Sequence, residues 1–114
     1  MKKSIKLFLA VLFFGSSVIA GDTLNFYDAN FKQALLTHFP VIDVDGNGEI
    51  SSTEAKAVTT LYLDGKGINN LSGVAYFSEL EQLTCSSNNF SVLDLRYNPK
   101  LKVIVLEQTA RTAN

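Results

Sequence analysis

Oxygen-bearing side chains are concentrated in one short segment, residues 43–54, which reads Asp-Val-Asp-Gly-Asn-Gly-Glu-Ile-Ser-Ser-Thr-Glu. Its side-chain donors lie at the first, third, fifth and twelfth positions: Asp43, Asp45, Asn47 and Glu54. Hard oxygen donors at this spacing converge on a divalent cation only if the chain turns sharply between them. Gly48, at the sixth position, permits such a turn because glycine adopts left-handed backbone conformations without steric cost. The spacing therefore predicts a metal-binding loop.

The other positions of the segment also fit the EF-hand loop pattern. Position seven of that pattern contributes a main-chain carbonyl, here that of Glu49, and position nine usually acts through a water, here near Ser51. Ile50 is expected to point away from the ion into a core. Three carboxylates around the ion suit calcium, whereas magnesium demands a tighter octahedron. We predict calcium as the cofactor and five metal-binding residues: Asp43, Asp45, Asn47, Glu49 and Glu54.

A second interpretation of the same residues needs no metal. Asp-Gly and Asn-Gly pairs are common in turns, and Ser51-Ser52-Thr53-Glu54 is a capping box that starts a helix by itself. These features do not require the whole twelve-residue pattern, so we favour the calcium interpretation.

The segment before the loop predicts a short helix. Asp28 can cap a helix whose apolar stripe is Phe31, Ala34, Leu35 and Phe39, and Pro40 ends it before the first metal ligand. A short exiting helix is expected from about Ser52 to Val58. This arrangement resembles the calcium loops of dockerin modules. The second loop that dockerins and calcium sensors normally carry is missing, which favours a structural calcium site.

The first twenty residues have the layout of a secretory signal. Lys2, Lys3 and Lys6 precede an apolar run over residues 7–14, and small residues lead to a cleavage site after Ala20. The apolar run is too short to span a bilayer, so we expect no stable membrane span after cleavage. A secreted, extracellular or cell-surface protein is predicted, and a periplasmic location also fits. Loss of the three lysines changes the net charge from −1 to −4 and leaves no basic cluster, which argues against a nucleic-acid partner.

The sequence offers no combination of nucleophile, base and orienting group, so we expect a protein that is not an enzyme. The single His38 lies near the end of the predicted helix, without a nucleophile beside it. The single Cys85 stands in an apolar pattern, where a thiol serves as a small hydrophobic side chain.

Apolar residues repeat along the second half of the chain. Leu80, Leu83 and Cys85 align with Leu101, Ile104 and Leu106 at an offset of 21 residues. Val58, Leu61 and Leu63 align with the same first three residues at an offset of 22. Residues 80–90 also match the pattern Leu-x-x-Leu-x-Cys-x-x-Asn-x-Phe, which resembles that of leucine-rich repeats.

This resemblance implies an α+β fold made of three parts. Residues 1–20 would be the signal peptide, residues 21–58 a helical cap with the EF-hand-like calcium loop, and residues 59–114 a short leucine-rich repeat solenoid of about three rungs. In such a solenoid Asn88 bonds the backbone groups of neighbouring turns.

The resemblance also implies a binding module on the cell surface or outside the cell, with a protein or a glycan as its ligand. The outward strand positions that would meet this ligand are Thr60, Tyr62, Gln82 and Thr84. The alternative function is an EF-hand-type calcium-binding or dockerin-like assembly module. Leu101, Ile104 and Leu106 begin a third strand, and residues 107–114 lack the apolar pattern of a cap. We therefore expect either self-association through this C-terminal edge or origin as a piece of a longer repeat protein.

Overall fold

The computed structural model describes residues 22–107, so the predicted signal peptide lies outside the described residues. Within that range the chain contains two α-helices, one 3₁₀ helix and three strands in the order α1 (Ala29–Leu36), α2 (Ser52–Lys56), β1 (Thr60–Tyr62), η3 (Ser72–Tyr76), β2 (Gln82–Thr84) and β3 (Val103–Val105). None of the helices in this range is long and apolar enough to cross a membrane.

Helix α1 begins where the sequence predicts it. The Asp28 side chain accepts the backbone N–H groups of Asn30 at 2.8 Å and Phe31 at 3.2 Å, which caps the first turn. Three of the four predicted stripe residues are buried, but Phe39 is 82% exposed. The prediction for Phe39 is wrong because α1 ends at Leu36, so the helical periodicity does not extend to residue 39.

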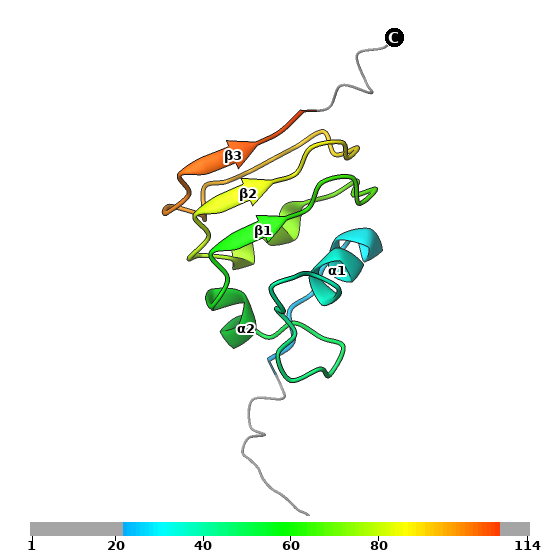
Figure 1. Ribbon diagram of the computed structural model, residues 1–114, viewed down its shortest axis with the longest axis vertical. Coiled ribbons are helices and arrows are strands. Elements are labelled where there is room, and N and C mark those ends of the chain that lie inside the picture. The colour runs from blue at the N-terminus through cyan, green and yellow to red at the C-terminus, as the bar shows by residue number, and fades with distance from the viewer. Residues whose placement is uncertain (1–21, 108–114) are drawn as a thin grey trace, which may run out of the picture.

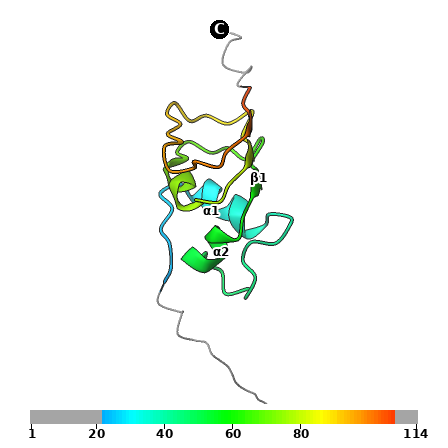
Figure 2. The ribbon, with the colours of Figure 1, turned by 90° about the vertical axis from the view of Figure 1, so that its left-hand side faces the viewer.

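The three strands form one parallel sheet in the order β1-β2-β3. Figure 1 shows them stacked one above another, with both α-helices beyond the β1 edge. Leu61 pairs with Leu83, and Leu83 pairs with Ile104, which confirms the predicted offsets of 22 and 21 residues. The segments that connect one strand to the next run along the other side of the molecule from the sheet (Figure 2). In the described chain, η3 is the only helical turn in these connections.

The buried apolar side chains form one cluster that the helices and the sheet share. Leu35 of α1, Ala55 of α2 and Leu61 of β1 are all 0% exposed, as is Phe77 at the end of η3. The same cluster reaches Cys85, after β2. Burial of this shared apolar surface is the main force that holds the elements together.

The predicted leucine-rich repeat solenoid of about three rungs is wrong for the described residues. They form a small α+β unit with a single three-stranded parallel sheet and little helix, and each strand is only three residues long. One cluster of buried apolar side chains includes members of α1, β1 and β2, so the helices and the sheet share a single core. The apolar repeat thus specifies strand register, and the α+β class is compatible with the structure. The boundary placed after residue 58 stays a prediction.

Asn88 links the chain after β1 to the chain after β2, as predicted. Its Oδ1 accepts the backbone N–H groups of Lys66 and Ile68, both at 3.0 Å. Its Nδ2 donates to the carbonyl oxygen of Leu63 at 2.7 Å and to that of Cys85 at 3.1 Å. Asn88 is 2% exposed, so these bonds satisfy polar backbone groups that water does not reach.

Candidate metal centre

Three of the predicted metal ligands come together in the structure. One carboxylate oxygen from each of Asp43, Asp45 and Glu54 lies within 4.8 Å of the others. Three negative charges this close repel one another, and a bound cation removes that repulsion. The cluster could therefore hold a metal ion.

The loop backbone brings these side chains together through two glycines and a set of side-chain contacts. Gly46 and Gly48 have φ values of 68° and 81°, in the left-handed region that favours glycine. Asp43 Oδ2 accepts the backbone N–H of Gly48 at 2.9 Å, and Asp45 Oδ1 accepts that of Asn47 at 3.1 Å. These bonds fold the loop inward around the space between the carboxylates.

Asn47 lies in the same loop, and its amide is engaged with the backbone. Its Oδ1 accepts the backbone N–H of Glu49 at 2.9 Å. An amide oxygen has two lone pairs, so Asn47 retains one that a cation can use. Its proposed role as the fifth-position ligand therefore agrees with the loop chemistry.

Glu54 belongs to both interpretations of the segment. Its Oε1 accepts the backbone N–H of Ser51 at 3.0 Å, and the Ser51 hydroxyl accepts that of Glu54 at 3.1 Å, which is the predicted capping box at the start of α2. Its Oε2 accepts the backbone N–H of Asp45 at 3.3 Å, so the same carboxylate also reaches back to the loop. The capping box therefore helps to hold the Glu54 carboxylate in the cluster with Asp43 and Asp45.

The side chain of Glu49 points elsewhere. Its carboxylate accepts a hydrogen bond from Lys32 Nζ of α1 at 2.6 Å, and it is not one of the three clustered carboxylates. This agrees with a seventh position that contributes its main-chain carbonyl to an ion and leaves its side chain free. The ion pair also fastens the metal loop to α1.

The C-terminal half of the loop is anchored in the core and to the N-terminal segment. Ile50 is 0% exposed, as predicted, and its carbonyl accepts the backbone N–H of Leu24 at 2.9 Å. Thr23 forms an antiparallel bridge with Ser51, and Asp22 accepts a hydrogen bond from the hydroxyl of Ser52. A cation bound at the loop would therefore add to the contacts that already hold the loop to the core and to the N-terminal segment.

The four predicted ligand-binding residues lie beside one another on β1 and β2. Thr60 pairs with Gln82 and Tyr62 pairs with Thr84, so the four side chains form two adjacent columns. Tyr62 is 48% exposed, and the other three are half-buried. The Thr84 hydroxyl oxygen is covered and has no hydrogen-bond partner within the described part of the chain, which leaves Tyr62 as the most accessible member.

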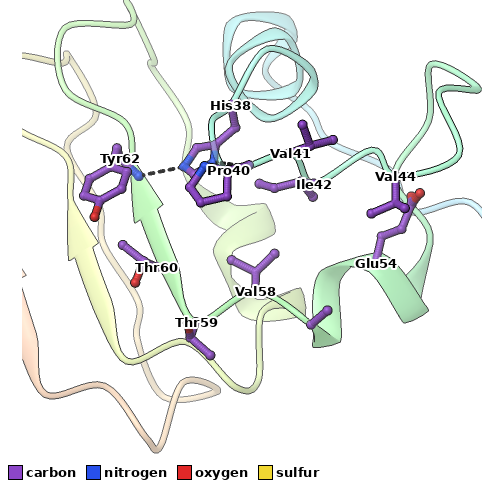
Figure 3. A pocket seen from close by; sticks show the side chains of 11 residues that line it. His38, Pro40, Val41, Ile42, Val44, Glu54, Val58, Thr59, Thr60 and Tyr62 are labelled. Carbon is purple, nitrogen blue, oxygen red and sulfur yellow. Dashed lines mark hydrogen bonds between the residues drawn. The ribbon is translucent and has the colours of Figure 1, made fainter.

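His38 has a contact that the sequence did not reveal. Its Nε2 accepts the backbone N–H of Tyr62 at 3.0 Å, and its Nδ1 is 2.9 Å from the carbonyl oxygen of Pro40. A carbonyl can only accept, so the Nδ1 atom carries the hydrogen. The rings of His38 and Tyr62 also stack, with 5.8 Å between their centroids (Figure 3). The segment that enters the metal loop is thereby joined to β1.

Cys85 is the small hydrophobic residue that the sequence predicts. It is 0% exposed, and burial raises the pKa of its thiol to about 11, with a further contribution from the negative charge of Asp64. A buried neutral thiol is a poor nucleophile, so Cys85 serves packing in the core.

Comparison with known proteins adds no family assignment. No protein-family model matches the chain, and a search of curated proteins finds no match. The resemblance to leucine-rich repeat proteins and to dockerin loops stays a prediction from the sequence.

Proposed function

We propose that this protein is a secreted or cell-surface binding module that a structural calcium ion stabilises. The observation that carries the proposal is the position of the clustered carboxylates of Asp43, Asp45 and Glu54 within one twelve-residue loop. That loop contacts α1 through Lys32 and the core through Ile50. An ion bound there would hold together segments that otherwise depend on a small core.

Calcium suits the donor set better than magnesium. The loop offers the three carboxylates, the amide oxygen of Asn47 and the carbonyl of Glu49, which is an all-oxygen set of the size that calcium accepts. Magnesium holds several of its own waters and demands a near-ideal octahedron. The affinity expected for an extracellular module of this kind is weak, with Kd of about 0.1–1 mM.

A structural role for the ion agrees with the way the loop is connected. Helix α1 ends at Leu36, seven residues before Asp43, so it does not run into the loop as the first helix of a sensor does. Within residues 22–107 there is one such loop, and its exit helix α2 has five residues. Ion binding would therefore hold the loop in place, without opening a pair of helices.

The ligand face is proposed to be the four-residue patch of Thr60, Tyr62, Gln82 and Thr84, with a protein or a glycan as the partner. An exposed tyrosine beside hydroxyl and amide groups combines apolar contact area with hydrogen-bonding capacity. The patch is small, so a modest affinity is expected.

An EF-hand-type or dockerin-like assembly module is the second candidate. Val44 favours it, because this residue lies inside the metal loop and is 75% exposed. An apolar side chain on the outer surface of a calcium loop can serve as a contact for another protein.

Thermal unfolding of the full chain in millimolar calcium and in chelator tests the proposal. At ten times its Kd, calcium should add about 1.4 kcal/mol to the free energy of unfolding, or about 5–10 °C in Tm. Glu54→Gln should abolish most of this shift. Glutamine keeps the hydrogen bonds of the capping box, so the variant separates metal binding from helix capping.

Glu49→Gln is the matched control, because it removes a charge from the same loop but not from the clustered carboxylates. It should lose only the Lys32 ion pair and keep the calcium shift. Identical Tm values for the wild type in calcium and in chelator would show that the loop is a turn with a capped helix.

A further inference from the structure

A pocket lies between β1 and the segment that leads into the metal loop. Its volume is about 210 Å³, comparable with the volume of one large side chain. Figure 3 shows β1 on one side, Pro40 and Val41 across from it, and Val58 with the end of α2 below. The pocket is thus built from the cap and the first strand together.

The walls of this pocket are mainly apolar, and its rim exposes more apolar surface. Val58 and Ile42 are buried beneath it, whereas Val41 is 63% exposed and Val44 is 75% exposed at its edge. Exposed aliphatic side chains around a concave apolar surface are typical of a site that another molecule covers.

The edge of β1 that faces the pocket supplies backbone hydrogen-bonding groups. Thr59 and Leu63 bond with β2, through the Gln82 N–H at 3.0 Å and the Thr84 carbonyl at 2.7 Å. Backbone groups alternate in direction along a strand, so those of Thr60 and Tyr62 face away from β2. His38 accepts the Tyr62 N–H, whereas the N–H and C=O of Thr60 have no partner among residues 22–107 outside the sheet ladder.

The charge of the surroundings limits what can bind. Glu54 is the one lining residue that carries a full charge, and Asp43 and Asp45 lie beside it in the metal cluster. The residues that line the pocket, all in the described part of the chain, include no lysine and no arginine. An acidic ligand would therefore be repelled, and a neutral or basic one would be accepted.

We propose that this pocket binds an extended, non-acidic peptide segment of a partner protein. A branched aliphatic side chain of the peptide fills the space between Val41 and Val58, and its backbone bonds the free groups of Thr60 as an added strand. This is the mode in which main-chain hydrogen bonds at a sheet edge supply affinity and a side-chain pocket supplies specificity. The site deepens the proposed binding function, but it does not depend on calcium in the loop.

Titration of the ¹⁵N-labelled full chain with N-acetyl-leucine methylamide tests this site by NMR. The probe carries one aliphatic side chain and one backbone donor and acceptor on each side. We expect saturable shifts of the Thr60 and Tyr62 amide signals in both calcium and chelator. N-acetyl-alanine methylamide should bind at least about tenfold more weakly, because three buried carbons are lost.

Val41→Arg should weaken leucine binding at least about fivefold by filling the rim of the pocket. Val92→Arg is the matched control, since Val92 is 73% exposed but does not line the pocket. The spectrum of each variant reports its own folding, and Val44→Arg replaces Val41→Arg if that variant unfolds.

Three results would overturn the proposal: no shift at Thr60, equal binding of the leucine and alanine probes, or stronger binding of methyl glucoside at the same residues. A calcium-dependent Tm with no leucine binding would overturn the pocket and leave the calcium module intact. Binding of the leucine probe without any effect of calcium on Tm would overturn the calcium module and leave the pocket intact.

Discussion

Asp28 accepts the backbone N–H of Asn70 at 2.9 Å, across 42 positions of sequence. The same Oδ2 atom accepts the N–H of Asn69 at 2.5 Å, and the Oδ1 atom caps α1. One carboxylate thus closes the first turn of the helix and fastens the chain between β1 and η3. The helix cap was predictable from the sequence, but this second contact was not.

Asp28→Ala should lower the free energy of unfolding by about 2 kcal/mol. Loss of the cap accounts for about 1 kcal/mol, and the two further N–H groups lose a charged acceptor. Urea unfolding measures the change. Asp94→Ala is the control, because Asp94 is exposed and pairs only with Arg96, two residues away.

The effect of Asp28 should depend on pH in a defined direction. Burial acts to raise its pKa, but hydrogen bonds from the backbone of Asn69, Asn70, Phe31 and Asn30 together hold the pKa below its ordinary value. A carboxyl with a lowered folded pKa stabilises the fold fully above its unfolded pKa and loses that contribution as the pH falls through the folded value. The difference between wild type and Asp28→Ala should therefore narrow below about pH 4. A difference that stays constant down to pH 2 would contradict this assignment.

The fold was predictable where local patterns determine it. The Asp28 cap and the spacing of Phe31, Ala34 and Leu35 identified α1, and the spacing of Leu61 and Leu83 identified the strand register. The same apolar repeat could not show that one core joins the strands to the helices. Periodic apolar positions specify which residues of neighbouring strands pair, but they do not specify which other elements pack against the sheet.

The candidate site divides in the same way. The carboxylate cluster was predictable because its members lie within twelve positions of sequence, and the structure brings Asp43, Asp45 and Glu54 together. The contact between His38 and Tyr62 spans 24 residues, so only the folded chain reveals it. A histidine near the end of the predicted helix was the only sequence signal, and it fits a helix-end or half-buried role equally well.

Asn88→Ala should lower the free energy of unfolding by about 3 kcal/mol or more. The substitution leaves the N–H groups of Lys66 and Ile68 and the carbonyl of Leu63 without their side-chain partner, and the bonds to Ile68 and Leu63 are buried. The neighbouring Asn89→Ala is the control, because Asn89 is exposed and its backbone bond to Ile68 does not need the side chain. Equal stability of the two variants would show that the buried amide bonds contribute little.

His38→Phe should lower the free energy of unfolding by about 1–3 kcal/mol, although the ring remains. Phenylalanine can stack on Tyr62 but cannot accept its N–H or donate to Pro40. His38→Gln keeps one polar partner and should recover part of the loss. Nitrogen NMR at neutral pH should find the Nδ1–H tautomer in the wild type, and a dominant Nε2–H form would refute the assigned contacts.

Strand β3 forms one edge of the sheet in the described chain, and its three residues together with Leu106, which follows it, make a run of four exposed apolar residues. Their exposed fractions are 45% for Val103, 48% for Ile104, 43% for Val105 and 40% for Leu106. Ile104 pairs with Leu83, which is 0% exposed. The side chain at this register position is therefore buried in β2 and half-exposed in β3.

This edge should support weak self-association of the chain. The Val103 N–H donates to the Glu81 carbonyl at 3.1 Å, and the Val105 carbonyl accepts the Cys85 N–H at 3.0 Å. By alternation the backbone groups of Ile104 face away from β2 and can pair with a second copy. Four half-exposed side chains bury less than the roughly 800 Å² per partner of a stable interface, so dimers should form only at about 0.1–1 mM protein. Light scattering over a concentration series measures this, and Val105→Lys should shift the midpoint upward at least about tenfold, whereas Val92→Lys should not. If the wild type stays monomeric throughout that range, the edge is protected and the expectation is wrong.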